Sequence, residues 1–577
     1  MLHRTLTAFS LFLIAIASPA LAQPMVSAAD PRAAAAGVEV LKQGGSAADA
    51  AIAMMLALGV IEPGHSGIGG GGFMVFHDAK TGRITTYDAR EAAPMAADGR
   101  WFYGPDGKPL GVRQAVPGGR SVGVPGELRL MEAAHGEHGK LAWKKLFIPA
   151  TRLAREGWAI TPRFNNFLTR MPATGFFNDW AKAYLYEPDG TAKAVGTVVK
   201  NPDLANLYER IAQHGPSYFY VGPPAQTLVA TINGAARNPS KMTLGDLASY
   251  HVKETAPICG SYRSYRICGV GRPSTGLTVV LLILKQLERF DMATLGKDSP
   301  VAWHLFAESS RLAYADRDTW LGDPDFVKVP VDGLLAADYI ATRSALISPD
   351  STMASIAPGM PAGAPPFRRA ELQPEHGTSS LTAVDRWGNV AEATVTIESV
   401  FGSGQSFSGI FLNNQLTDFN IVPDKGGYLT ANRVEGGKRP RSSMSPLIVY
   451  DPNGKIRIAI GAAGGSTIIA QIAKALVGVI DWNLSAQDAI SLGLLYAPSQ
   501  GGAAEKGTQL EAMLPALAAL GERLTVTPLG LKANAIEWRD GTWVGAADPR
   551  SEGVSMGIDG KAVKPVAPVA QGDRPSE

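Results

Sequence analysis

A threonine that follows a glycine, Gly377-Thr378, stands at the start of a segment with strand character. A threonine hydroxyl is a poor nucleophile unless a base lies beside it. Cleavage of the chain before Thr378 would supply that base, because the new α-amine has a reference pKa near ~8. An ordinary strand threonine fits the local sequence as well. The pattern alone therefore leaves two interpretations, a self-processing nucleophile or a structural residue.

Two other patterns exclude more common chemistries. The tract Gly67-Ile-Gly-Gly-Gly-Gly72 lacks the Gly-Lys-Ser/Thr of a phosphate loop and leads into a strand. We interpret it as backbone that must pass close to something. His135-Gly-Glu-His138 lacks the spacing of helical zinc proteases, so we expect a solvated loop there. The sequence indicates no metal site and no organic cofactor.

The elements around Thr378 can be predicted from caps, turns and periodicity. Asp30-Pro31 begins a helix that Gly44-Gly45 ends, and Ser46 with Asp49 forms a capping box for a helix to about Leu58. Residues 123–250 and 275–316 are mainly helical, and an apolar helix covers 467–480. Antiparallel strand pairs are expected at 73–76 with 83–88, 378–385 with 390–397, 447–450 with 455–460, and 535–538 with 542–544. Residues 351–366 read as a mobile surface segment, and the chain from about Lys561 reads as an unstructured tail.

The chain contains two cysteines, Cys259 and Cys268. The residues between them predict a hairpin that turns at Arg263-Ser264 and places the cysteines opposite each other on a non-hydrogen-bonded pair, about 4.5 Å apart at Cα. A disulfide and two free, buried thiols both remain open. Two cysteines cannot form a four-ligand zinc site by themselves.

The composition gives information on the partners of the protein, and the N-terminal residues give information on its compartment. Of 577 residues, 45% are hydrophobic and 18% charged, and 54 basic residues against 52 acidic ones give a formal charge of +2. This near balance gives no reason to expect a nucleic acid or an anionic membrane as partner. Residues 1–22 predict a secretory signal peptide with small residues before the cut after Ala22. We therefore expect a periplasmic or secreted protein; a membrane anchor is the alternative, but the apolar run is shorter than the ~18–20 residues needed to span.

Several longer motifs, in order, resemble the γ-glutamyltransferase family (glutathione hydrolase proenzymes) of the N-terminal-nucleophile hydrolase superfamily. The resemblance covers roughly residues 25–558. The motifs are Gly69-Gly-Gly-Gly-Phe-Met74, Asp88-Ala-Arg-Glu-Ala-Ala-Pro94, Gly123-Val-Pro-Gly126, Asp385-Arg-Trp-Gly-Asn389, Leu412-Asn-Asn-Gln415, Arg439-Pro-Arg-Ser-Ser-Met-Ser-Pro446, Gly464-Gly465 and Gly545-Ala-Ala-Asp-Pro-Arg550.

The resemblance implies an α/β (α+β) fold, the four-layer αββα sandwich of this superfamily. It also implies cleavage between Gly377 and Thr378. The products would be a large subunit of residues 23–377 and a small catalytic subunit of residues 378–577, which form a heterodimer within one intertwined αββα body. The implied reaction transfers a γ-glutamyl group from glutathione or a γ-glutamyl amide to Thr378, and then to water or to an amino-acid or peptide acceptor.

The resemblance also assigns roles to individual residues. Thr378 matches the nucleophile, and Thr396 matches the residue that hydrogen-bonds its hydroxyl. Gly464 and Gly465 match the backbone donors to the oxyanion. The substrate's α-carboxylate would be bound by Arg90, Ser442 and Ser443, and its α-ammonium by Gln415 and Asp418.

The sequence departs from the family pattern at four places. Ser380 and Leu381 stand where the family usually has His and an aromatic residue, and Thr417 replaces a frequent Asp. Glu398 stands where an Asn usually contacts the substrate ammonium, so a second carboxylate would join Asp418, or else turn toward solvent. Residues 418–439 are fewer than in members with a full lid loop, which predicts an open site.

Two alternative functions remain. A cephalosporin (glutaryl) acylase of the same superfamily would use the same nucleophile, but its donor lacks the α-ammonium for which Asp418 and Glu398 are suited. An inactive periplasmic binding protein would have no need of Thr378, Thr396 and the glycine pair.

Overall fold

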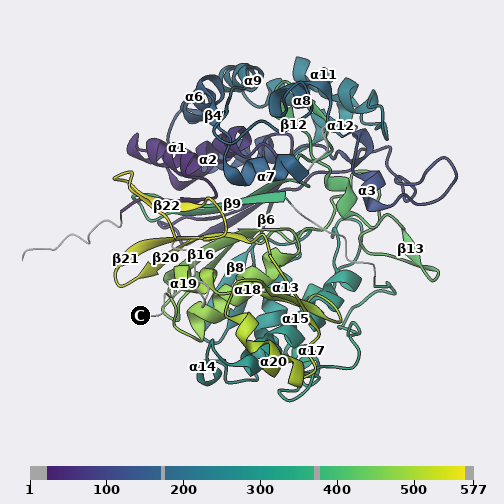
Figure 1. Cartoon of the computed structure of the whole chain (residues 1–577), viewed down its shortest axis with the longest axis vertical. Coiled ribbons are helices and arrows are strands. Elements are labelled where there is room, and N and C mark those ends of the chain that lie inside the picture. The colour runs from purple at the N-terminus through teal and green to yellow at the C-terminus, as the bar shows by residue number, and fades with distance from the viewer. Residues whose placement is uncertain (1–22, 171–175, 370–376, 566–577) are drawn as a thin grey trace, which may run out of the picture.

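Two β-sheets face each other between two layers of helices in the computed structural model (Figure 1), which describes residues 23–170, 176–369 and 377–565. The αββα arrangement implied by the resemblance is confirmed. The signal peptide predicted at residues 1–22 lies outside the described residues.

The first sheet has eight strands in the order β23-β22-β1-β9-β10-β2-β3-β6, and every neighbouring pair is antiparallel. Its strands are β1 (Met25–Ala28), β2 (Gly71–His77), β3 (Ile84–Ala89), β6 (Lys253–Thr255), β9 (Gly377–Val384), β10 (Val390–Glu398), β22 (Val554–Gly557) and β23 (Ala562–Val563). The predicted 378–397 hairpin is therefore confirmed, and it lies between β1 and β2. Segments from before and after Thr378 thus alternate within one sheet. The tail predicted from Lys561 is wrong at its start, because β23 still pairs with β22.

The second sheet has six strands in the order β21-β20-β16-β15-β8-β7. Their bounds are β7 (Ile258–Tyr262), β8 (Tyr265–Gly269), β15 (Leu447–Tyr450), β16 (Ile456–Ala463), β20 (Lys532–Arg539) and β21 (Thr542–Ala547). This sheet contains the two later hairpins predicted from the sequence. Its β16 and β20 pack against β9 of the first sheet, so the two sheets meet at the strand that carries Thr378.

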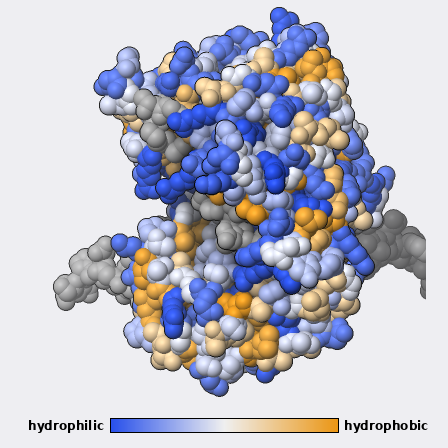
Figure 2. Space-filling view, turned by 90° about the vertical axis from the view of Figure 1, so that its right-hand side faces the viewer, coloured by the Kyte–Doolittle hydropathy of each residue, from blue (hydrophilic) through white to orange (hydrophobic). Residues whose placement is uncertain are grey.

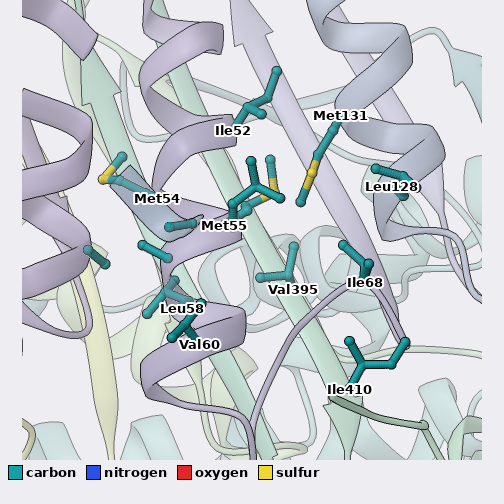
Figure 3. Packing of buried hydrophobic residues seen from close by; sticks show 14 of the residues in the cluster. Ile52, Met54, Met55, Leu58, Val60, Ile68, Leu128, Met131, Val395 and Ile410 are labelled. Carbon is teal, nitrogen blue, oxygen red and sulfur yellow. The ribbon is translucent and has the colours of Figure 1, made fainter. Parts of the chain in front are cut away.

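The helices that cover the first sheet begin where their capping residues predict. Asp30 accepts a hydrogen bond from the Arg32 N–H before α1 (Pro31–Lys42), and Ser46 and Asp49 form the expected capping box of α2 (Ala47–Ile61). All 15 residues of α2 are buried, which explains why the helix is apolar on every side. Figure 3 shows its Ile52, Met55 and Leu58 beside Val395 of β10, together with Leu128 and Met131 of α4 (Glu127–His138).

The other face of the second sheet carries α13 (Gly276–Leu287), α15 (Pro300–Trp320) and α18 (Thr467–Ile480). The bounds of α18 are those predicted. The remaining helices are α3 (Val112–Ala115), α5 (Trp143–Leu146), α6 (Ile148–Glu156), α7 (Pro162–Arg170), α8 (Asp179–Leu185), α9 (Pro202–His214), α10 (Ser217–Val221), α11 (Pro223–Asn233), α12 (Leu244–Ser249), α14 (Met292–Leu295), α16 (Val331–Leu334), α17 (Ala337–Ser344), α19 (Ala486–Ser491) and α20 (Leu510–Ala519).

Short strands complete the fold: β4 (Trp158–Ala159), β5 (Val198–Val199), β11 (Ser406–Phe407), β12 (Ile410–Phe411), β13 (Asp424–Lys425), β14 (Tyr428–Leu429), β17 (Leu495–Tyr496), β18 (Gly502–Glu505) and β19 (Leu524–Thr527). Within the described residues, no helix has both the length and the apolar character needed to cross a membrane.

Two segments differ from the sequence-based expectation. His135-Gly-Glu-His138 is the last turn of α4 and no loop, and the His138 ring stacks on Phe76 with 3.7 Å between ring centroids. Residues 351–366 have no regular secondary structure, as expected for a connecting segment. Their backbone is nevertheless tied down, since the N–H groups of Thr352, Met353 and Gly359 each donate a hydrogen bond of 2.8 Å to the body of the molecule.

The cysteine hairpin has the predicted register. Cys259 lies opposite Cys268 and Tyr262 lies opposite Tyr265, and Arg263 takes a left-handed conformation at the turn with φ 52°. The Cα atoms of the two cysteines are 4.2 Å apart, and the structure joins them in a disulfide. Of the two possibilities left open by the sequence, the structure holds the bonded one.

The disulfide predicts the thiol content of the protein. The denatured, unreduced chain should show no free thiol, and reduction should release two. Because the bridge closes a short loop, replacing both cysteines by serine should lower the free energy of unfolding by about 2–3 kcal/mol. Thiol titration and urea unfolding measure the two effects. Two thiols before reduction would contradict the bonded hairpin.

Candidate functional site

Thr378 lies in an irregular part of the β9–β10 ladder. Ser379 pairs with Val395 and Gly377 pairs with Glu398, so the register shifts between these two pairs. The shift places Thr378 opposite the bulged residue Thr396. Thr378 is the second residue of β9 and is 5% exposed.

Both threonine hydroxyls contact the carbonyl oxygen of Gly377. The Thr378 hydroxyl donates to this oxygen at 2.7 Å, and the Thr396 hydroxyl donates to the same atom. The Glu398 N–H donates to the Thr396 oxygen at 2.8 Å, which fixes the direction of its proton. The sequence predicted that the hairpin would bring Thr378 and Thr396 together. In the continuous chain they meet on the peptide bond proposed for cleavage.

The glycine tract positions Thr396 from the other side. A Cβ atom on Gly70 would lie 2.0 Å from the carbonyl oxygen of Thr396, and one on Gly69 would lie 2.1 Å from that of Phe411. No side chain fits at such distances. The predicted close approach of this backbone is confirmed, and its neighbours are the backbone at Thr396 and at Phe411.

The predicted oxyanion turn lies between β16 and α18. Gly464 and Gly465 have φ values of 122° and 60°, which favour glycine. Neither N–H donates to any residue of the described part of the chain, so both are available to an oxyanion. Gln471 of α18 braces the turn, because its Nε2 donates to the Ala463 carbonyl at 2.7 Å and to the Thr467 hydroxyl at 2.9 Å.

Arg90, Asp418 and Gln415 form a buried polar group. The Arg90 guanidinium donates to the Asp418 carboxylate and to the Arg441 carbonyl at 2.8 Å, and Gln415 Nε2 donates to the Asp418 carboxylate at 2.7 Å. With its amide nitrogen so used, Gln415 presents its Oε1 atom, which is buried and finds no hydrogen-bond donor among the described residues. The group thus combines a cation, an anion and an unused acceptor.

The two predicted serines differ in position. Ser442 lines the same small cavity as Thr378, and its oxygen accepts from the Met444 N–H at 3.1 Å. Ser443 is not among the described residues that line it. Its hydroxyl oxygen instead accepts a hydrogen bond of 2.7 Å from Arg317. Ser442 can therefore reach a ligand in this cavity, whereas Ser443 supports the wall behind it.

The cavity has a volume of about 10 Å³, the space of about one water molecule. Its described lining residues are Arg90, Gly377, Thr378, Thr396, Glu398, Gln415, Asp418, Ser442, Met444, Gly465 and Ile468. The open site predicted from the short 418–439 segment stays a prediction, because the residues just before Gly377 lie outside the described part of the chain. Figure 2 views the side on which β13 projects in Figure 1, and that face is mainly hydrophilic with small, separate apolar patches.

Glu398 faces this cavity and is 3% exposed, so the alternative of a solvent-directed side chain is wrong. Its Oε2 atom accepts hydrogen bonds of 2.5 Å from Asn414 Nδ2 and from the Ser399 hydroxyl. The residue has φ 77°, a left-handed conformation that is uncommon outside glycine. The bulge that positions Thr396 thus also turns Glu398 into the cavity.

A charged cluster behind Thr378 was not predicted from the sequence. Lys532 of β20 donates to the Glu62 carboxylate at 2.5 Å, to the Ser379 hydroxyl at 3.2 Å and to the Thr378 carbonyl at 3.3 Å. Burial alone would raise the pKa of Glu62, but nearby cations, chiefly Lys532, outweigh burial and hold that pKa at about 2. Glu62 is therefore ionised at neutral pH. No local motif marks Lys532, which comes from the other sheet.

The described residues contain no group of three or more His, Cys, Asp or Glu side chains able to hold a metal ion. The chemistry available in the site is that of a hydroxyl nucleophile, backbone N–H donors and a buried pair of opposite charges.

Comparison with known proteins identifies the family of the chain. The chain belongs to the gamma-glutamyltranspeptidase family, whose model matches residues 33–558. A glutathione hydrolase proenzyme of Bacillus subtilis (strain 168) is 34% identical over 552 residues, which cover 93% of this chain and 91% of the relative. The acylase ACY 1 proenzyme of Pseudomonas sp. (strain SE83) is 33% identical over 546 residues, which cover 93% and 94%.

The fold is also that of a solved acylase. The crystal structure of cephalosporin acylase from Bacillus halodurans superposes with a TM-score of 0.81 at 24% identity, covering 95% of this chain and 99% of the other. This likeness shows that the two chains share a fold. It does not separate the two kinds of donor, a γ-glutamyl or a glutaryl group.

The oxyanion turn gives a prediction about stability. Gly464→Ala should destabilise more than Gly454→Ala, although both residues have positive φ. Both alanines incur the left-handed cost of about 1–2 kcal/mol. The Cβ at 464 would also lie 2.7 Å from the Thr467 hydroxyl, whereas at 454 nothing lies within 4 Å. Urea unfolding of the two variants measures the difference. Equal losses would contradict a tightly braced turn.

Proposed function

We propose that the protein is a self-processing γ-glutamyl hydrolase and transferase that acts on glutathione and γ-glutamyl amides through an acyl group on Thr378. The observation that carries this proposal is the composition of the cavity beside the Thr378 hydroxyl. A free amino-acid head group has a carboxylate for Arg90 and Ser442 and an ammonium for Asp418 and the Gln415 amide oxygen. Such a head group would direct the γ-carbonyl of the same ligand toward Thr378.

In the processing step, the Thr378 hydroxyl adds to the Gly377 carbonyl carbon. The C–N bond to Thr378 then breaks, the hydroxyl proton passes to the departing nitrogen, and an ester remains. Water hydrolyses the ester to the Gly377 carboxylate and the free hydroxyl. The 2.7 Å contact between the Thr378 hydroxyl and the Gly377 oxygen supports this step, and the hydrogen bond from Thr396 polarises the carbonyl.

In turnover, the Thr378 α-amine takes the hydroxyl proton while the oxygen attacks the γ-carbonyl of the donor. The oxyanion would accept hydrogen bonds from the N–H groups of Gly464 and Gly465. Collapse of the tetrahedral species expels the donor's amine, which leaves with the proton. Water or an amino-acid or peptide amine then attacks the acyl ester and restores Thr378.

The second candidate is a glutaryl acylase, which the similarity to an acylase proenzyme favours. A glutaryl donor has the carboxylate for Arg90 but no ammonium for Asp418 and Gln415. The buried acceptor oxygen of Gln415 would remain unpaired with that donor, at a cost of about 1–3 kcal/mol. The γ-glutamyl donor satisfies the same atoms.

We also propose that the precursor is exported to the periplasm or secreted and is then cut into subunits of residues 23–377 and 378–577. The Cys259–Cys268 disulfide is compatible with an oxidising compartment. The ladders of β1 with β9 and of β2 with β10 would hold the subunits together after the cut.

Thr378→Ala should give one uncut, inactive chain, because the substitution removes the attacking oxygen. The wild-type protein should give two chains on a denaturing gel, and N-terminal sequencing of the small chain should begin at Thr378. Ser403→Ala, a buried serine that donates to the Leu412 carbonyl away from the cut, is the control and should process normally. Any other new N-terminus would remove Thr378 as the nucleophile.

Glu398→Gln should distinguish the two donors. Gln keeps an oxygen that can accept from Asn414 but removes the negative charge that faces the cavity. A charge-assisted hydrogen bond contributes roughly 1.5–3 kcal/mol. We therefore expect kcat/KM for γ-glutamyl-p-nitroanilide to fall about tenfold or more, while kcat/KM for glutaryl-p-nitroanilide changes little. Equal, small losses for both donors would show that Glu398 does not contact the ammonium.

A further inference from the structure

Lys532 connects the two sheets behind the nucleophile. It is the first residue of β20 in the second sheet, and its ammonium reaches the first sheet, where it donates to the Thr378 carbonyl at 3.3 Å and the Ser379 hydroxyl at 3.2 Å. The side chain is 1% exposed. A buried lysine is uncommon and needs a partner. Glu62, which ends α2, supplies the opposite charge at 2.5 Å.

The contact with Thr378 matters because the sheet itself holds this residue weakly. On the β10 side, the regular ladder ends at the pair of Ser379 with Val395, and on the β1 side it ends at Leu381 with Ala28. The next pair beyond the bulge joins Gly377 to Glu398. Cleavage would place Gly377 on the other subunit, so Thr378 would become a chain terminus beyond the last paired residue. Terminal residues fray unless they are tied down.

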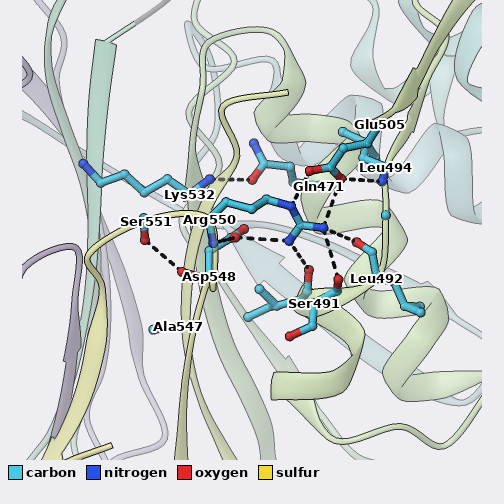
Figure 4. A network of polar contacts seen from close by, with 12 residues as sticks. Gln471, Ser491, Leu492, Leu494, Glu505, Lys532, Ala547, Asp548, Arg550 and Ser551 are labelled. Atoms are coloured by element: carbon cyan, nitrogen blue, oxygen red, sulfur yellow. Dashed lines mark hydrogen bonds and ion pairs between the residues drawn. The ribbon is translucent and has the colours of Figure 1, made fainter. Parts of the chain in front are cut away.

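Lys532 also contacts the residue that braces the oxyanion turn. Its backbone N–H donates to Gln471 Oε1 at 3.2 Å, and Figure 4 shows the two residues joined in this way. Gln471 in turn donates to Ala463 and Thr467 on either side of the glycine pair. One residue therefore touches the nucleophile through its side chain and the oxyanion turn through its backbone.

We propose that Lys532 is a positioning residue that holds Thr378 in place relative to the Gly464-Gly465 turn once the Gly377–Thr378 bond has been cut. This inference rests on the proposed function, since it concerns the processed enzyme. Before the cut, the pair of Gly377 with Glu398 and the hydrogen bond from Thr396 also hold the segment. Lys532 should therefore matter more for turnover than for processing.

The buried ion pair of Lys532 with Glu62 determines which variants can be compared. Lys532→Met alone would leave the Glu62 carboxylate buried without its cation, which is strongly destabilising. The double variant Glu62→Gln, Lys532→Met removes both charges and the contact with Thr378. Glu62→Gln alone also removes one charge of the pair, but it retains Lys532, which can donate to the Thr378 carbonyl as an ammonium or as a neutral amine. The matched control is Lys474→Met, because Lys474 is also buried but donates to the Ile490 and Leu492 carbonyls.

The experiment measures processing on denaturing gels, and kcat and KM with γ-glutamyl-p-nitroanilide. The double variant should still be cut into two chains, and its kcat should fall about ten- to a hundredfold, because a small misplacement of a nucleophile has that effect. Its KM should stay within about threefold, since Arg90 and Asp418 are untouched. Glu62→Gln should lose less kcat than the double variant. Lys474→Met should retain kcat within about twofold.

Hydrogen exchange gives a readout that needs no substrate. In the processed double variant, the amides of residues 379–384 should exchange faster than in the processed wild type. In the uncut Thr378→Ala background, the same two substitutions should change this exchange much less.

The contrary outcomes separate the two proposals. A wild-type protein that is cut and active, beside a double variant with wild-type kcat and exchange, would overturn the role of Lys532 alone. So would a kcat loss of the same size in Lys474→Met. A wild-type protein that is cut but inactive on the γ-glutamyl donor overturns the substrate assignment, and the exchange comparison still decides on Lys532. A wild-type chain that is never cut overturns both.

Discussion

The antiparallel ladders that join β1 to β9 and β2 to β10 are the interaction on which the rest of the structure depends. They place strands from before and after Gly377 in one sheet, buried between α2 and the second sheet. A break at residue 377 would remove one covalent bond but none of these ladder pairs. The fold can therefore tolerate a cut at the centre of its core, where a cut in a chain of separate domains would release one of them. The new α-amine that such a cut would create would become available as a base without loss of the body that positions it.

The same sheet sets the geometry of the site. A bulge in β10 brings Thr396 onto the Gly377 carbonyl and turns Glu398 into the cavity, and the glycine tract allows β2 to approach that bulge closely. The second sheet supplies the oxyanion turn at the end of β16 and Lys532 at the start of β20. The site is thus assembled at the line where the two sheets meet. Its parts come from segments several hundred residues apart, and their relative position is decided by how the sheets pack.

Because the parts of the site come from distant segments, some of its features could be predicted from the sequence and others could not. Local signals gave the caps of α1 and α2, the bounds of α18 and the register of the cysteine hairpin, because each depends on neighbouring residues. Motifs carried by the family resemblance gave Thr378, Arg90 and Gly465, which the structure brings to one cavity.

The remaining features depend on contacts between distant segments. Lys532 has no motif and reaches Glu62 only through the packing of two sheets, and lysine is rarely buried. The small size of the cavity beside Thr378 could not be inferred from the sequence, because it depends on how distant segments pack around it. The loop expected at His135 is wrong because that segment is the last turn of α4, and the stacking of His138 on Phe76 is a tertiary contact that the local sequence does not reveal.

If the protein acts on γ-glutamyl donors as proposed, the buried pair of Arg90 and Asp418 gives a physical reason for a zwitterionic head group. Breaking a buried ion pair is strongly unfavourable when one charge is left without a partner. A ligand with only a carboxylate would compete with Asp418 for Arg90. It would provide no positive group to pair with the Asp418 carboxylate. A ligand with both an α-carboxylate and an α-ammonium can insert between the two side chains and replace each partner with an equivalent one. Under the proposed function, the resting ion pair and the acceptor oxygen of Gln415 beside it would favour donors that carry both charges on one carbon over donors that carry one.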